Sequence, residues 1–228
     1  MKQFFIAASV MLAASFFITG CDDDDFSINR KEIMLHAGET YQLSANEAAT
    51  WAIGNNFIAS ISSGGLVTGN HVGTTVAKAV SGSEVAYCGV VVTARYNTFS
   101  EPILNASYNI NMVKKAERRR LISATNTTAT FEGGKKNVNY LKYHFSPAGG
   151  RMDSIQVEIE HNGASEVYTE VSGFLEERYQ EVELSEPVSG IRWFASGASS
   201  DDTQSSFTVK YVRNMPSKGN CSLITYVL

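Results

Sequence analysis

The sequence contains little cysteine and little proline. Its 228 residues include three cysteines and four prolines, and no proline lies between Phe26 and Ala94. So few cysteines exclude a scaffold held together by disulfides. A bridge between Cys88 and Cys221 would have to join two different domains, because the sequence pattern changes between them, so we expect two separate thiols.

The sequence also lacks an excess of charge of either sign and a second long apolar run. Its 19 lysines and arginines against 23 aspartates and glutamates give a formal net charge of -4. This mild acidity gives no reason to expect nucleic acid as a partner. No segment after the N-terminal one is apolar over the roughly 20 residues that a transmembrane helix requires. The chain length suits one large domain or two ordinary ones.

The N-terminus has the composition of a secretory signal. Lys2 supplies a positive charge, residues 4–17 form an apolar run, and the small residues Thr19 and Gly20 follow. Because the run is shorter than roughly 20 residues, a cleaved signal is favoured over a membrane-spanning anchor. An ordinary secreted signal that is cut before Cys21 is the other alternative.

The segment Ile18-Thr19-Gly20-Cys21 at the end of this run resembles a bacterial lipobox. The resemblance implies that residues 1–20 are a signal peptide and that Cys21 becomes a lipidated N-terminus, which anchors the protein in a membrane. Residues 21–25 are predicted to form a flexible tether, because the four aspartates that follow Cys21 repel one another. This acidic run also resembles the export signal of surface lipoproteins of Bacteroidetes, which implies an outer-membrane location facing the cell exterior.

Residues 26–94 consist of short apolar stretches separated by turn residues, with no helical period. Several short strands at even spacing predict a β-sandwich of about seven strands. Cys88 alternates with Val90 and Val92, which predicts a buried and unreactive thiol.

The order of motifs in this region is specific. It runs Ile33-x-Leu35, Gly38-Glu39-Thr40, Leu43, Thr50-Trp51, Ile58-Ala59-Ser60-Ile61, Gly65-Leu66-Val67-Thr68-Gly69, Gly73-Thr74-Thr75-Val76 and Val90-Val91-Val92. This order resembles the group 2 bacterial immunoglobulin-like domain over nearly the full length of that module. The resemblance implies that Trp51 fills the centre of the sandwich and that the paired glycines allow a turn. Such modules occur in adhesins and in the stalks of surface enzymes, so the fold alone does not choose a role.

Residues 95–102 are polar and end in Glu101-Pro102, so we place a linker there. Residues 103–228 are predicted to form a second domain of unassigned function. Its first helix covers residues 110–121, begins at a cap from Ser107 or Asn109, and has an apolar side. Four basic residues lie on the other side of this helix: Lys114, Lys115, Arg118 and Arg119.

A second helical stripe contains Val167, Val171 and Leu175, although Gly173 inside it costs about 1 kcal/mol relative to alanine. Each helix is followed by about three predicted strands, which suggests a tandem helix-plus-three-strand repeat with two helices on an antiparallel sheet. The predicted fold class is therefore mainly β, with an N-terminal immunoglobulin-like β-sandwich followed by an α+β domain. The repeat loosely resembles the architecture of the beta-lactamase inhibitor protein.

Local sequence contains no catalytic pattern that we recognise. Neither a nucleophile elbow nor a P-loop is present, and Glu158, Glu160 and His161 indicate a solvated strand edge rather than a zinc site. Glu176 and Glu177 adjoin on a helix and point in different directions, which disfavours a glycosidase pair. We therefore expect no enzyme activity, no metal and no cofactor.

One short pattern concerns modification. Asp153-Ser154-Ile155 resembles the acceptor pattern for O-glycosylation in Bacteroidetes, which would place a sugar on Ser154. The alternative is that Ser154 only opens a strand.

The chain order predicts a cell-surface lipoprotein that acts as an adhesion or ligand-binding module. The immunoglobulin-like domain would be a spacer, and the C-terminal domain would bind a glycan or protein ligand. The contact would be either the basic side of the first helix or the exposed face of the sheet, where Trp193 is an aromatic candidate. A solvated helix face is the alternative for the basic residues. Other function classes are an inhibitor of a secreted enzyme and a structural envelope lipoprotein with no soluble ligand.

Overall fold

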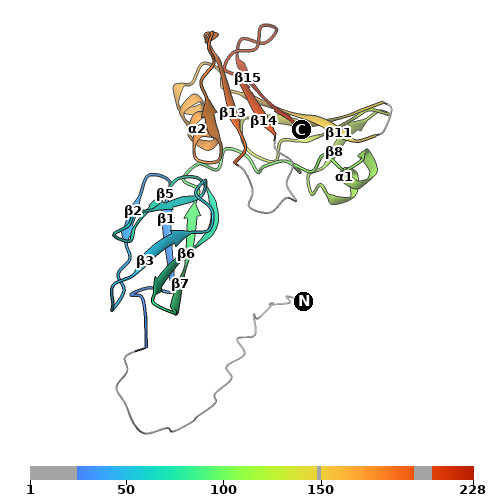
Figure 1. Cartoon of the computed structure of the whole chain (residues 1–228). Coiled ribbons are helices and arrows are strands. Elements are labelled where there is room, and N and C mark those ends of the chain that lie inside the picture. The colour runs from blue at the N-terminus through green and yellow to red at the C-terminus, as the bar shows by residue number, and fades with distance from the viewer. Residues whose placement is uncertain (1–24, 148–149, 198–206) are drawn as a thin grey trace, which may run out of the picture.

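The computed structural model describes residues 25–147, 150–197 and 207–228, which form two connected domains (Figure 1). Strands β1 to β7 form the N-terminal domain, and helices α1 and α2 with strands β8 to β15 form the C-terminal domain. The protein is mainly β, as predicted. Within the described ranges, no helix has the length and apolar character needed to cross a membrane. Cys21, the predicted lipidation site, lies outside the described residues.

The N-terminal domain is a sandwich of seven strands, which confirms the prediction. One sheet has the order β1-β7-β6-β3 and the other has the order β2-β5-β4. Strands β1 and β7 pair in parallel, and the other pairs are antiparallel. The strands are β1 Glu32–His36, β2 Thr40–Gln42, β3 Thr50–Ile53, β4 Ala59–Ile61, β5 Leu66–Gly69, β6 Gly73–Ser81 and β7 Glu84–Thr93.

Alternation along the strands places one side of each in the core of the sandwich. Cys88 is a buried free thiol on β7, as its alternation with Val90 and Val92 predicts. Trp51 is only partly buried at the edge of this core, which corrects its expected place at the centre. A Cβ on Gly65 would lie 3.0 Å from the Trp51 ring and 2.6 Å from the Leu43 carbonyl oxygen. Since Gly65 also has a φ of 84°, the turn accepts only glycine without strain.

The C-terminal domain contains one eight-stranded antiparallel sheet with the order β12-β13-β14-β15-β11-β10-β9-β8. Each helix is followed by four strands in a meander, and the two halves meet where β11 pairs with β15. The predicted repeat therefore has four strands in each half rather than three. The elements are α1 Ile110–Ala116, β8 Leu121–Ala124, β9 Thr128–Glu132, β10 Val138–Phe145, β11 Met152–Glu160, α2 Ser165–Glu176, β12 Gln180–Val182, β13 Ile191–Ala195, β14 Thr208–Val212 and β15 Cys221–Val227.

Helix α1 is shorter than predicted. The Asn109 side chain caps its start by accepting hydrogen bonds from two backbone N–H groups. The helix ends at Ala116, because Glu117 takes an extended backbone and its carboxylate accepts a hydrogen bond from the Tyr143 hydroxyl at 2.6 Å. Leu121, the last residue of the predicted helix, instead begins β8.

Both helices cover the same face of the sheet. Figure 1 shows α2 beside β13 and α1 near β8, at opposite ends of the sheet. Residues of α1, α2 and the inward-facing strand positions form a single buried cluster. Among the residues that the structure describes, no helix covers the opposite sheet face, as predicted.

The segment predicted as a linker packs against the C-terminal domain. Phe99 is 2% exposed in the core of that domain, where its ring lies 4.2 Å from the Phe174 ring. The Thr98 hydroxyl donates to the Glu170 carbonyl at 3.0 Å. Residues 95–102 are therefore fixed along α2 rather than loose between two domains.

Candidate ligand-binding groove

The four basic residues predicted as a ligand contact do not share one environment. Lys114, Lys115 and Arg118 are exposed. Arg119 is 12% exposed, forms an ion pair with Glu117 at 2.8 Å and donates to a backbone carbonyl of the 95–102 segment. Arg119 therefore stabilises the turn after α1, and three basic side chains remain available to solvent.

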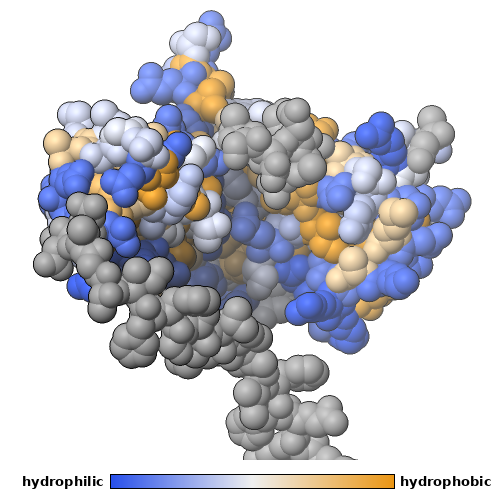
Figure 2. All heavy atoms as spheres, turned by 60° about the horizontal axis from the view of Figure 1, so that its bottom comes forward, coloured by the Kyte–Doolittle hydropathy of each residue, from blue (hydrophilic) through white to orange (hydrophobic). Residues whose placement is uncertain are grey.

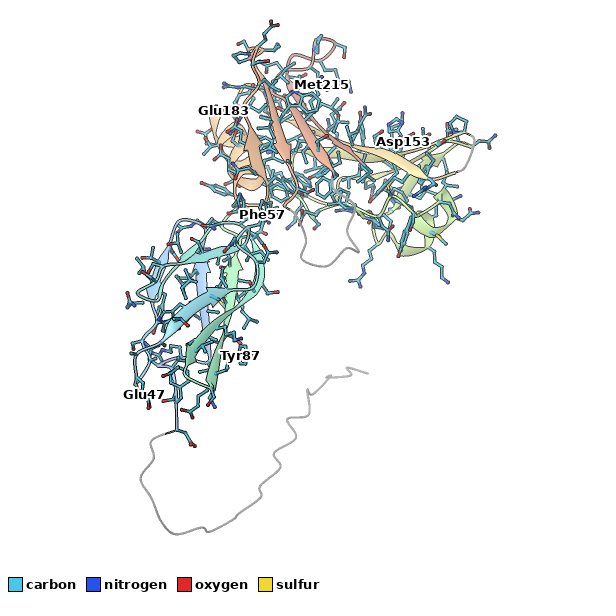
Figure 3. All side chains as sticks on the ribbon, viewed as in Figure 1. Glu47, Phe57, Tyr87, Asp153, Glu183 and Met215 are labelled. Atoms are coloured by element: carbon cyan, nitrogen blue, oxygen red, sulfur yellow. The ribbon has the colours of Figure 1, made fainter. Side chains whose placement is uncertain are left out.

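Ser154 is the third residue of β11 and lies on the sheet face without helices. It is half-buried, pairs with His144 and Val227, and its hydroxyl donates to Asp153 at 2.9 Å. Asp153 lies near the far end of the sheet from α2 (Figure 3). The structure places Ser154 in a strand, and its glycosylation stays a prediction.

The sheet face without helices carries a row of mostly polar side chains. Cross-strand pairing aligns Trp193, Lys210, Thr225, Gln156, Lys142 and Thr130 across six strands. All six are half-buried, and the Lys210 ammonium lies 5.4 Å from the centre of the Trp193 ring. One face of this ring is therefore already used by a cation–π contact.

Glu158 on the same face is a buried carboxylate with its own partners, and His161 is buried as well, which corrects the prediction of a solvated strand edge for these two residues. It is 2% exposed and accepts hydrogen bonds from Asn139 at 2.9 Å, Tyr140 at 3.1 Å and the Lys218 ammonium at 3.0 Å. Burial acts to raise the pKa of Glu158, but these donors outweigh it and lower the pKa. Burial and the neighbouring carboxylate raise the pKa of Tyr140 to about 12. All of these groups satisfy one another, which indicates a structural role.

The C-terminal domain is hollowed between α2 and strands β13 and β14. This hollow, which we call the α2–β14 groove, has a volume of about 730 Å³, which lies in the size range of small-ligand sites. Its lining residues are Tyr96, Ser165, Tyr168, Thr169, Ser172, Gly173, Glu176, Gly190, Arg192, Tyr211 and Arg213.

The helix supplies a polar wall to this groove. Ser165, Thr169, Ser172 and Glu176 recur at spacings of four, three and four residues, which places them on one side of α2. With a rise of 1.5 Å per residue, this polar side is roughly 16 Å long. The other side of the helix carries the buried residues Val171, Phe174 and Leu175, so the sequence folds as an amphipathic helix with its polar side in the groove.

The strands supply arginine and tyrosine side chains. Arg192 pairs with Tyr211 across β13 and β14, and Arg213 follows two residues later on the same side. Arg192 donates to both Glu181 oxygens at 2.6 and 2.5 Å and pairs with Glu176 at 2.8 Å. The Glu181 hydrogen bonds are the main cause of its raised pKa. The guanidinium of Arg192 is therefore occupied by two carboxylates.

Arg213 has a different environment. Its guanidinium carbon lies 3.9 Å from the centre of the Tyr168 ring, and the side chain is exposed. No described carboxylate lies within ion-pair distance of it. The Tyr168 hydroxyl donates to Asn214 at 2.9 Å and lies 3.2 Å from Nε2 of the buried His161, which fixes the ring that Arg213 covers. A second hollow of about 400 Å³ also borders Arg213, which therefore stands between the two spaces.

The 95–102 segment, which leads into the C-terminal domain, forms one border of the groove. Tyr96 crosses α2 at Gly173, where an added Cβ would overlap its ring. This close approach explains why a glycine occurs inside the helix, in spite of its low helix propensity.

Glu177, next to the groove, joins the two domains. Its carboxylate accepts from the backbone N–H groups of Arg95 at 2.9 Å and Tyr96 at 3.0 Å and pairs with Arg178 at 2.7 Å. Its carbonyl accepts from the Val72 N–H of the N-terminal domain at 2.7 Å. The Glu176 side chain thus lines the groove, whereas the Glu177 side chain binds groups at the domain junction. This agrees with the prediction that the two side chains point in different directions.

A larger hollow of about 900 Å³ lies at the junction itself, lined mainly by loops of the N-terminal domain. Figure 3 shows Phe57 at this end of the domain, with Glu47 and Tyr87 at the other. The polar side chains there bind their own loops: Asn55 accepts from Phe57, Asn70 donates to Asn56, and His71 bonds the Phe57 carbonyl. Because few polar groups remain for a ligand, we favour the α2–β14 groove.

Sequence reasoning did not find the groove residues. Tyr96, Arg192 and Arg213 are far apart in the chain, and no local motif connects them. The signal that was present is the hydroxyl-rich side of the second helix, from Ser165 to Glu176. Over the described residues, no group of three or more His, Cys, Asp or Glu side chains is arranged to hold a metal ion.

The surface seen in Figure 2 is polar over much of its coloured area. In Figure 2, apolar residues reach the visible surface in separate patches among hydrophilic ones. No broad apolar face is seen in that view among the residues it colours.

Comparison with known proteins identifies the first domain. Among curated proteins, none matches this chain. Residues 25–90 match the family of the bacterial Ig-like domain (group 2), which agrees with the resemblance and with the seven-stranded sandwich. The protein therefore carries a group 2 bacterial Ig-like domain, and such a domain suggests a bacterial surface protein.

Proposed function

We propose that the protein is a lipid-anchored protein of the outer membrane, facing the cell exterior, whose C-terminal domain binds a ligand in the α2–β14 groove. The observation that carries this proposal is the groove itself, because it combines concave shape with tyrosine rings, hydroxyl groups and an arginine that has no described carboxylate partner. The Ig-like domain acts as a spacer. Lipidation at Cys21 supplies the membrane contact in this proposal.

The domain junction supports the spacer role. Glu177 connects α2 to the segment after the Ig-like domain and to the Val72 loop. Arg95 also pairs with Glu39 of the Ig-like domain at 2.6 Å. A junction with these contacts would hold the C-terminal domain at a set position relative to the spacer.

A glycan array and a pull-down with residues 22–228 test the proposal. Thr169→Trp places an indole in the groove from an exposed helix position, and the adjacent Glu170→Trp places the same ring on another side of α2. We expect Thr169→Trp to abolish ligand capture and Glu170→Trp to preserve it.

A third variant examines the basic surface by changing Lys114, Lys115 and Arg118 to glutamine. Loss of binding in this variant alone would contradict the groove assignment. Capture of a single secreted enzyme would favour the inhibitor function. No binding in either the glycan array or the pull-down would favour a structural lipoprotein.

A further inference from the structure

Two arginines face the α2–β14 groove, but only one has donors available for a ligand. Arg192 is held by Glu181 and Glu176, so its charge is compensated. Arg213 is held by stacking on Tyr168, which leaves its N–H groups unused by any described carboxylate. A guanidinium that is positioned by stacking and keeps its donors is suited to bind a carboxylate, sulfate or phosphate group.

The rest of the groove is neutral or acidic. Ser165, Thr169 and Ser172 offer hydroxyl groups along the helix, and Glu176 stands at the far end of that side. A ligand with several negative charges would meet the Glu176 carboxylate, whereas a ligand hydroxyl would donate to it. The charge arrangement therefore fits a ligand with one negative group at the Arg213 end and hydroxyl groups along the helix.

The lining also favours a sugar over a peptide. Its described residues are glycine, serine, threonine, tyrosine, glutamate and arginine, and none of these has an aliphatic side chain. Pockets for peptide side chains are usually apolar, whereas tyrosine faces and hydroxyl groups suit the rings and hydroxyls of a saccharide. Tyr96, fixed over Gly173, supplies a ring at one end of the groove.

We propose that the α2–β14 groove binds a saccharide that carries a single anionic substituent, and that Arg213 is the contact for that substituent. This inference rests on the proposed function, because it names the ligand class of the same site. Uronic acids and singly sulfated sugars share this chemistry, and the experiment separates them.

The test is calorimetric titration of residues 22–228 with three probes: a uronic acid disaccharide, a singly sulfated disaccharide and the neutral disaccharide of the same length. We expect one anionic probe to bind at least about tenfold more tightly than the neutral one, since a charge-assisted hydrogen bond contributes on the order of that factor. Arg213→Gln should remove this preference and retain weak binding of the neutral probe. Arg213→Lys should restore part of it.

Arg118→Gln is the matched control, because it removes the same charge from an exposed position outside the groove. Equal losses in Arg213→Gln and Arg118→Gln would overturn the proposal in favour of general charge attraction. If no saccharide binds but another ligand is captured and is blocked by Thr169→Trp, the ligand class is wrong while the proposed function stands. If Thr169→Trp changes no capture at all, both fail.

Discussion

Gly173 shows how one residue positions the groove. The Tyr96 ring occupies the space that a Cβ would need. Gly173→Ala should lower the free energy of unfolding by about 1 to 2 kcal/mol, because the cost of overpacking exceeds the gain in helix propensity. Chemical denaturation measures this change.

Gly219→Ala is the control, since no heavy atom lies within 4 Å of its added Cβ. We expect it to be close to neutral. A Gly173→Ala protein as stable as wild type would show that the Tyr96 contact does not constrain the helix.

Glu158 should make stability depend on pH. Its pKa is lowered in the folded state, so the carboxylate contributes stability above the pKa of the unfolded state, and this contribution is lost as the pH falls through the folded pKa. Glu158→Gln should therefore cost about 1 to 3 kcal/mol near pH 7, because charge-assisted hydrogen bonds are lost. The difference from wild type should shrink toward about pH 3.

Thermal melts of both proteins across this pH range are the measurement. A difference that stays constant from neutral to acidic pH would contradict the assignment of Glu158 as an ionised partner of Lys218.

At the scale of elements, residues 95–102 depend on an acceptor distant in sequence. Glu177→Ala removes the carboxylate that binds the Arg95 and Tyr96 N–H groups, so trypsin should cleave after Arg95 faster than in wild type. Glu176→Ala is the matched control, because this neighbour pairs with Arg192 instead. Equal cleavage rates in all three proteins would show that Glu177 does not hold the segment.

This segment also shows what the sequence could not predict. Its polar composition and Glu101-Pro102 indicated a linker, whereas its fixed position comes from Phe99 in the core and from Glu177 about 80 residues away. Contacts of such long sequence separation leave no local periodicity.

Local patterns predicted the elements well where neighbours in sequence set the structure. Alternation located the strands of the Ig-like domain, and the apolar stripe located α2. The predicted helix was too long because Arg118 and Arg119 continue the helical pattern of the sequence. In the structure α1 ends before Glu117, whose carboxylate is bound by Tyr143. The groove was not predictable, since its walls come from three distant parts of the chain.

At the scale of the whole molecule, the proposed surface location has a direct test. Protease treatment of intact cells should remove the C-terminal domain from a lipid-anchored protein that faces outward, and Cys21→Ala should release the protein from the membrane fraction. Full protection from the protease in intact cells, with cleavage after lysis, would contradict the outward orientation.

Binding of a ligand by the C-terminal domain in the α2–β14 groove can be observed directly. Hydrogen exchange of residues 22–228, with and without the anionic disaccharides, tests it most directly because it reports the contact surface without any substitution. Binding in the groove should slow exchange in residues 165–176 and 190–197 and around Arg213. Protection confined to residues 110–119 or to the outer face of β10 and β11 would contradict it, whereas no protection with any of these sugars would contradict the saccharide as the ligand class.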